Sequence, residues 1–211
     1  MAHLQRTLMV LSILVTCSQA VCGQETSEGT KKKIEAPSPD GQFAFRYTGE
    51  SDSEEKQTYD LIDKRSGKVL TSVAESDPDL GPSARFYMKV LWKPDSQAFA
   101  LTATLWKRGS NVEVYLRNVS TFRPIEIPEL LAEIPDEIKK AKSFPHVSEL
   151  NAQSAKRWQK DGSLVVEIET IEDGNDEGFS ATATRTVVLG FDRSDKAKIL
   201  KSTTKFKVEK L

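Results

Sequence analysis

Residues 93–101, KPDSQAFAL, join a tight turn to an apolar strand, and this stretch decides the fold that the sequence predicts. Pro94 fixes the backbone angle φ at the second position of a turn, and Asp95 can accept hydrogen bonds from nearby backbone. The apolar residues that follow are typical of a buried strand. The stretch therefore predicts a chain reversal that starts a new β-strand.

The same combination of turn and strand occurs at two other places in the chain. Residues 38–45 read SPDGQFAF, and residues 159–166 read QKDGSLVV without the proline. Trp92 and Trp158 stand directly before the second and third turns. Glycine at the last turn position accepts a positive φ, which suits a chain reversal. We therefore expect three similar hairpins, and we expect the two tryptophans to pack in successive units.

These units resemble the WD40-like repeats of TolB-type β-propellers, whose blades recur around W-S-P-D-G followed by an apolar strand. The resemblance continues past the turn at residues 60–68 and 114–120, where such a blade carries a strand and a hairpin. It covers most of the chain from Ser38 to the C-terminus. Three units could make an incomplete propeller, a curved open sheet, or a sandwich with propeller-like hairpins.

The remaining pattern predicts an all-β, mainly antiparallel domain over residues 38–211 with a helical insertion. Two short helices are expected within residues 128–142, beginning at Pro128 and Pro135, and covering a sheet edge. The second has acids in its first turn and lysines in its last, which complements the helix dipole. Alternating segments predict strands at 43–47, 58–63, 69–70, 86–92, 98–105, 112–118, 164–171, 181–191 and 199–208.

The first 23 residues have the order of a secretion signal. Arg6 precedes the apolar run 8–15, and small or polar residues follow. The run is too short to span a bilayer, which needs about 20 residues. Cleavage fits after Ala20 or after Gly23. Residues 14–17, LVTC, also have the outline of a bacterial lipobox, so a lipid-anchored envelope protein is an alternative. Residues 24–37 are expected to form a flexible leader.

Few residues of the expected mature chain suit familiar catalytic chemistry. His146 is its single histidine, and neither cysteine lies beyond residue 22. No phosphate-binding loop, nucleophile elbow or zinc motif occurs. Acidic residues gather at 50–55 and 172–178, where a solvated loop is the favoured interpretation and a Ca²⁺ loop lacks the EF-hand order. The sequence therefore assigns no catalytic, cofactor-binding or metal-ligating residue, and no cofactor.

Charge and compartment together indicate the class of function. The net charge of −1 for the whole chain becomes −2 without Arg6, which does not provide the basic field that nucleic acids require. Lys31, Lys32 and Lys33 are interpreted as solvated charges before the domain. No transmembrane segment is expected in the mature chain.

The leading hypothesis is an exported, secreted or periplasmic, non-catalytic binding or scaffold module with a protein or glycan partner. The alternative is a carboxylate-dependent hydrolase acting on an extracellular polymer.

Overall fold

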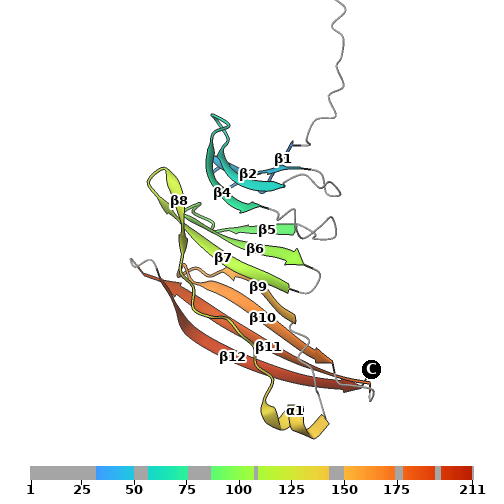
Figure 1. Cartoon of the computed structure of the whole chain (residues 1–211). Coiled ribbons are helices and arrows are strands. Elements are labelled where there is room, and N and C mark those ends of the chain that lie inside the picture. Colours follow the sequence, from blue (N-terminus) through green and yellow to red (C-terminus); the bar gives the residue numbers. More distant parts are fainter. Residues whose placement is uncertain are drawn as a thin grey trace, which may run out of the picture.

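The computed structural model describes residues 32–49, 57–75, 87–106, 109–142, 150–173, 178–192 and 196–210. Within them the chain is almost entirely antiparallel β-structure with one short helix and no closed barrel (Figure 1). The predicted fold class, all-β with a short helical insertion and an open or sandwich-like sheet, is confirmed.

The first sheet is a four-stranded antiparallel meander in which each strand pairs with the next. It contains β1 (Lys32–Glu35), β2 (Phe43–Thr48), β3 (Thr58–Asp63) and β4 (Val69–Glu75). Strand β1 lies inside the predicted flexible leader, so that prediction is wrong for these four residues. The Tyr59 hydroxyl donates to Glu35 Oε1 at 3.0 Å, which ties β1 to the sheet.

The remaining strands form a second, eight-stranded sheet built from two further meanders. A single parallel pair of residues, Ser110 and Ala152, joins the meanders through β7 and β9. Strand β8 pairs with the far end of β7. The strands are β5 (Tyr87–Trp92), β6 (Ala98–Trp106), β7 (Gly109–Asn118), β8 (Thr121–Ile125), β9 (Leu150–Trp158), β10 (Leu164–Asp173), β11 (Phe179–Phe191) and β12 (Ala197–Lys210).

The three meanders lie one above another (Figure 1). The first hydrophobic core lies between the first and second meanders, and the second core lies between the second and third. Strand β6 takes part in both cores, because Phe99 and Leu101 face the first meander while Ala100 faces the third. A strand that is buried on both faces carries an almost continuous apolar run, which is what residues 98–101 show. The middle meander is thus the central layer of the stack.

The insertion differs from its prediction, because only α1 (Asp136–Lys142) is helical. Residues 128–134 have no helical structure, and Leu130, Ala132 and Ile134 alternate into the second core. The carbonyl of Leu130 accepts hydrogen bonds from the side-chain amides of Asn151 and Gln153. Side chains of β9 thus satisfy this carbonyl in the extended form, without a helical hydrogen bond.

The insertion also covers a different surface from the predicted one. Its backbone crosses the core-facing side of the third meander, where Arg185 donates to the carbonyl of Leu131 at 2.8 Å. The chain just before the insertion meets the edge strand β12 at that strand's first residue, where Ala197 N donates to the Glu126 carbonyl at 2.8 Å. Among the described residues, most of the β12 edge is therefore left uncovered. No helix in the described ranges is long and apolar enough to cross a membrane.

Two tryptophan side chains link neighbouring meanders in the same way. Trp92 Nε1 donates to the Ala36 carbonyl at 2.8 Å, and Trp158 Nε1 donates to the Leu91 carbonyl at 3.0 Å. Ala36 and Leu91 both lie two residues before a turn begins. The Trp92 ring also packs against aromatic rings of the first core, 5.1 Å from Phe99 between centroids. The expected packing role of these two tryptophans is confirmed.

Replacing Trp92 by phenylalanine should destabilise the protein, since it removes the indole donor and part of the aromatic surface. We expect a loss of about 1–2 kcal/mol in the free energy of unfolding, mostly from the unpaired Ala36 carbonyl and lost ring contacts. Tyr87→Phe, on the same strand but 61% exposed, is the control and should change stability by less than about 0.5 kcal/mol. Urea unfolding followed by circular dichroism measures both, and equal effects would contradict the proposed link.

Candidate functional site

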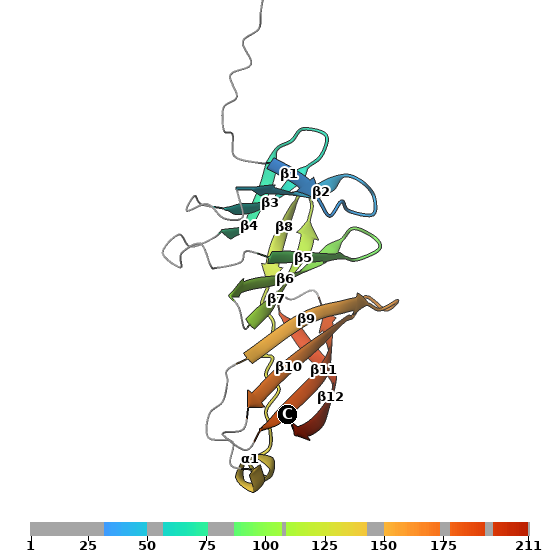
Figure 2. The same ribbon diagram turned by 90° about the vertical axis from the view of Figure 1, so that its right-hand side faces the viewer.

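The three predicted turns lie along one side of the stack, where their hairpins project one above another (Figure 2). We call residues 38–41, 93–96 and 159–162 the turn column. In each turn the aspartate Oδ1 accepts a hydrogen bond of 3.0 Å from the backbone N–H two residues later. The amide of the fourth turn residue also donates to the first residue's carbonyl at 2.9–3.0 Å. The three sequence motifs therefore fold into the same local structure.

The last position of each turn has a positive φ: 70° at Gly41, 57° at Ser96 and 85° at Gly162. Serine rarely adopts this conformation, yet Ser96 is fully buried. Its hydroxyl accepts a hydrogen bond from Asp40 N at 3.1 Å, and this contact connects the first turn to the second. The side chain thus compensates for the backbone strain by joining neighbouring turns.

The carboxylates of the turn column are held in their ionised forms. Partial burial opposes ionisation of Asp40 and Asp95, but hydrogen bonds outweigh it and lower both pKa values. For Asp40 the donors are Ser38, the Gln42 amide and Ser96; for Asp95 they include Lys93 and the Gln97 amide. The Ser163 hydroxyl and amide lower the pKa of Asp161. These groups are fixed acceptors at neutral pH, whereas a general acid needs a raised pKa.

Arg117 covers the first turn from the neighbouring meander. Its guanidinium lies 4.8 Å from the centre of the Phe43 ring and 3.9 Å from Asp40 Oδ2. It also donates to Gln42 Oε1 at 3.4 Å. A cation placed over an aromatic face and beside a carboxylate stabilises both, so Arg117 contributes to the contact between the first two meanders.

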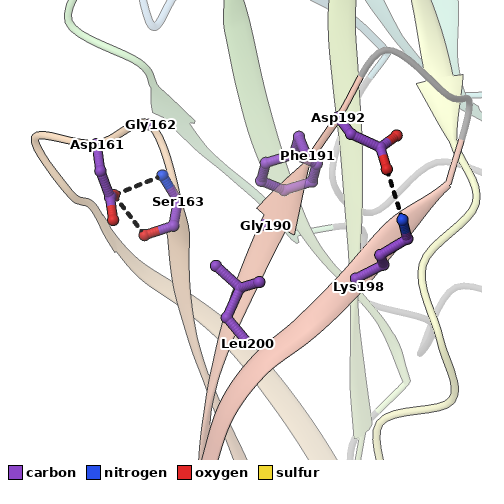
Figure 3. Close-up of a pocket in the computed structure, with 8 residues that line it drawn as sticks. All are labelled: Asp161, Gly162, Ser163, Gly190, Phe191, Asp192, Lys198 and Leu200. Carbon is purple, nitrogen blue, oxygen red and sulfur yellow. Dashed lines mark hydrogen bonds and ion pairs between the residues drawn. The ribbon is translucent and has the colours of Figure 1, made fainter.

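A small pocket of about 230 Å³ opens beside the third turn (Figure 3). Asp192 Oδ2 and Lys198 Nζ form an ion pair of 2.7 Å on one side, and Asp161 lies on the other. The hydrogen bond and charge of Asp192 raise the pKa of Lys198, so its amine stays protonated. The lining residues come from one turn and the adjoining ends of β11 and β12: Asp161, Gly162, Ser163, Gly190, Phe191, Asp192, Lys198 and Leu200.

The pocket offers little to a catalytic mechanism. Its volume lies below the ~300 Å³ at which sites for drug-sized ligands begin. A protonated amine cannot act as a nucleophile, and the Asp161 carboxylate is occupied by Ser163 at 2.6 Å and 3.0 Å. Gly190 lies so close to Leu200 that an added Cβ would stand 2.7 Å from Leu200 Cδ1. The pocket is therefore a tight packing feature with a charged rim that can accept a small polar group.

Several residues considered in the sequence are placed by the structure, and others are not. His146 and the acidic residues at 50–55 and 174–177 lie outside the described residues. Glu172 is almost fully buried in β10, where its Oε1 pairs with Lys139 Nζ of α1 at 3.2 Å. Its Oε2 has no hydrogen-bond partner among the described residues. Glu172 therefore anchors the helix and is not presented to a polymer.

Residues near the N-terminal and middle strands have equally local roles. Lys33 pairs with Glu35 at 2.8 Å within β1, whereas it was expected to be a solvated charge before the domain. Asn118, the first residue of a glycosylation sequon, is exposed at the end of β7. Trp106 ends β6. Neither Lys33 nor Asn118 lies among the described residues that line the pocket.

Sequence reasoning missed most of the residues that complete the site. Ser96, Arg117, Asp192 and Lys198 were not singled out, because their partners are distant in sequence or depend on strand register. Only Ser96 carried a usable signal, since it occupies the position that Gly41 and Gly162 fill in the other turns. Within the described ranges, no group of three or more histidine, cysteine, aspartate or glutamate residues could hold a metal ion.

Comparisons with known proteins add no functional assignment. No protein-family model matches the chain, and no curated protein matches it.

The strained serine gives a test of the contact between turns. Ser96→Ala keeps the positive φ and loses the hydroxyl, so it should cost about 1–2 kcal/mol of unfolding free energy. Ser96→Gly loses the same hydrogen bond but relieves about 1 kcal/mol of backbone strain, so it should be the more stable of the two. Thermal and urea unfolding rank them. If alanine proved as stable as the wild type, the hydroxyl would not connect the turns.

Proposed function

We propose that the protein is an exported, non-catalytic binding or scaffold module for a protein or glycan partner. The observation that carries this proposal is the use of the turn-column carboxylates. Asp40, Asp95 and Asp161 each accept hydrogen bonds from their own turn and have lowered pKa values. They make a rigid, polar rim, which suits recognition better than proton transfer.

The proposed architecture is that of a partial TolB-type propeller. Three four-stranded meanders, each with its turn between the first and second strands, support this proposal. Blades of a propeller present their loops on a common surface, and the turn column lies along one side of the stack (Figure 2). Under this proposal, loops on that side provide one recognition surface.

The carboxylate-dependent hydrolase is the second candidate, and the pocket beside Asp161 and Asp192 is where it would act. The purified protein is assayed for hydrolysis of labelled polysaccharides and labelled proteins, and the same polymers are used in co-sedimentation. We expect binding without turnover, because neither carboxylate is arranged as a general acid. Turnover that is lost in both Asp161→Asn and Asp192→Asn, but kept in Asp63→Asn, would overturn the proposal. Asp63 is a suitable control because it accepts the same kind of turn hydrogen bonds from Ser66, far from the pocket.

Export is proposed on the sequence of residues 1–23, which lie outside the described residues. The mature protein should begin at Val21 or Gln24, because the small residues Ala20 and Gly23 suit the export peptidase. Intact mass measurement of the protein from the periplasm or medium, after expression of the full chain, locates the cleavage site. An acylated Cys17 at the N-terminus would instead support the lipid-anchored alternative, and an uncleaved chain would contradict export.

A further inference from the structure

Strand β12 is the longest strand of the fold and the last of its sheet. It pairs with β11 along its whole length, from Ala197 opposite Phe191 to Lys210 opposite Phe179. On its other side, the only described backbone bond is that from Ala197 N to the Glu126 carbonyl. Every residue from Lys198 to Lys210 is exposed. A strand edge of this kind presents unpaired N–H and C=O groups that can pair with another strand.

The core-facing side of β12 is partly apolar. Residues opposite each other in an antiparallel pair lie on the same face, and Phe206 and Val208 stand opposite Ala183 and Ala181 of the second core. They are 46% and 40% exposed. Ile199, opposite Leu189, is 38% exposed. The apolar face of the third meander therefore continues onto its last strand, where it ends in half-exposed side chains.

The outward side of β12 is basic. Lys201, Lys205 and Lys207 lie opposite Val188, Thr184 and Thr182, none of which faces the second core. Within β12 five lysines stand against the single acid Glu209. Glu209 already pairs with Lys207 at 2.5 Å, while Lys201 and Lys205 make no ion pair with any described residue. The surface is thus positively charged in a protein whose net charge is slightly negative.

The two sides together define the partner. A strand added to the edge would place alternate side chains on the two faces of the sheet. Apolar side chains on one face would cover Phe206 and Val208, and acidic side chains on the other would meet Lys201 and Lys205. We propose that β12 is a docking edge for an extended, acidic strand of a partner protein in which apolar and acidic residues alternate. This rests on the proposed function as a binding module and names its partner class.

A second copy of the same chain fits this edge poorly. Pairing β12 with another β12 would bring lysine rows together on the outward face, and like charges opposite each other destabilise a strand pair. Lysines on an edge strand also prevent self-association. The same charges attract an acidic strand, so the edge discriminates by charge between self-pairing and the partner.

The probe is a fluorescently labelled decapeptide of alternating valine and glutamate. It should bind the protein, and amide hydrogen exchange should slow within residues 198–210. A decapeptide of the same composition with all valines before all glutamates, and an alternating valine-lysine decapeptide, should bind at least about tenfold more weakly. The first control keeps charge and loses alternation, and the second keeps alternation and reverses the charge.

Variants then test the residues. Lys201→Glu/Lys205→Glu should weaken binding of the alternating acidic peptide by about tenfold or more. The matched control is Lys64→Glu/Lys89→Glu, which changes the same total charge at exposed positions on the β3–β4 turn and on the opposite edge strand β5. Circular dichroism and urea unfolding should show that both double variants keep the wild-type fold.

Three results would overturn the docking edge: no binding of the alternating acidic peptide, equal binding of the block peptide, or no slowed exchange in β12. Any of these leaves the binding-module proposal standing, because another surface could serve it. Polymer turnover in the hydrolysis assay would instead overturn the module function and leave the β12 measurements unaffected. The two failures are therefore distinguishable.

Discussion

Burial of β6 on both faces is the constraint on which the rest of the structure depends. Phe99 and Leu101 need a layer above them, and Ala100 needs one below. A second layer packed on one face of β6 would leave its other face exposed to water, as is common in antiparallel sheets. The chain supplies one meander for each side, so a stack of three layers follows from an apolar run in one strand.

The turn column keeps these layers in register. The hydrogen bond from Asp40 N to Ser96 Oγ joins two turns. The indole N–H groups of Trp92 and Trp158 each donate to a backbone carbonyl of the preceding meander, two residues before its turn. Apolar contacts between sheets are not directional, so they tolerate sliding. Polar contacts at one side of the stack are directional, and they fix how each meander sits on the next. The apolar surface thus drives association, and the turns determine its geometry.

Local signals predicted what local physics decides. The three turns and most strands could be read from the sequence, because turn chemistry and period-two alternation act within a few residues. Strand β9, LNAQSAKRW, was missed because its core-facing Gln153 is polar. That side chain is satisfied by Val112 N and the Leu130 carbonyl, which are distant in sequence.

The error at residues 128–134 has a similar cause. Two prolines and a run of helix-forming residues predict a helix. Leu130, Ala132 and Ile134 are instead alternate residues of an extended segment, and all three face the second core. The core that receives them is made by strands of the second and third meanders, which are distant in sequence. The site residues Arg117, Asp192 and Lys198 were unpredictable for the same reason, since each acts through a partner that strand register brings near. Tertiary packing overrode local propensity at these positions.

The edge strands at the two ends of the chain, β1 and β12, differ in how they avoid unwanted pairing. The first sheet begins with the four-residue strand β1, while the last sheet ends with the fourteen-residue strand β12. Short edge strands are a common protection against unwanted pairing, and β1 fits that description. Strand β12 is long, and its core-facing side is partly apolar. Its lysines are what protects it against unwanted pairing. Positive charge on an edge strand repels another positively charged strand and attracts a negatively charged one. Protection by charge therefore allows pairing with an acidic strand, whereas a short edge strand offers little pairing to any partner.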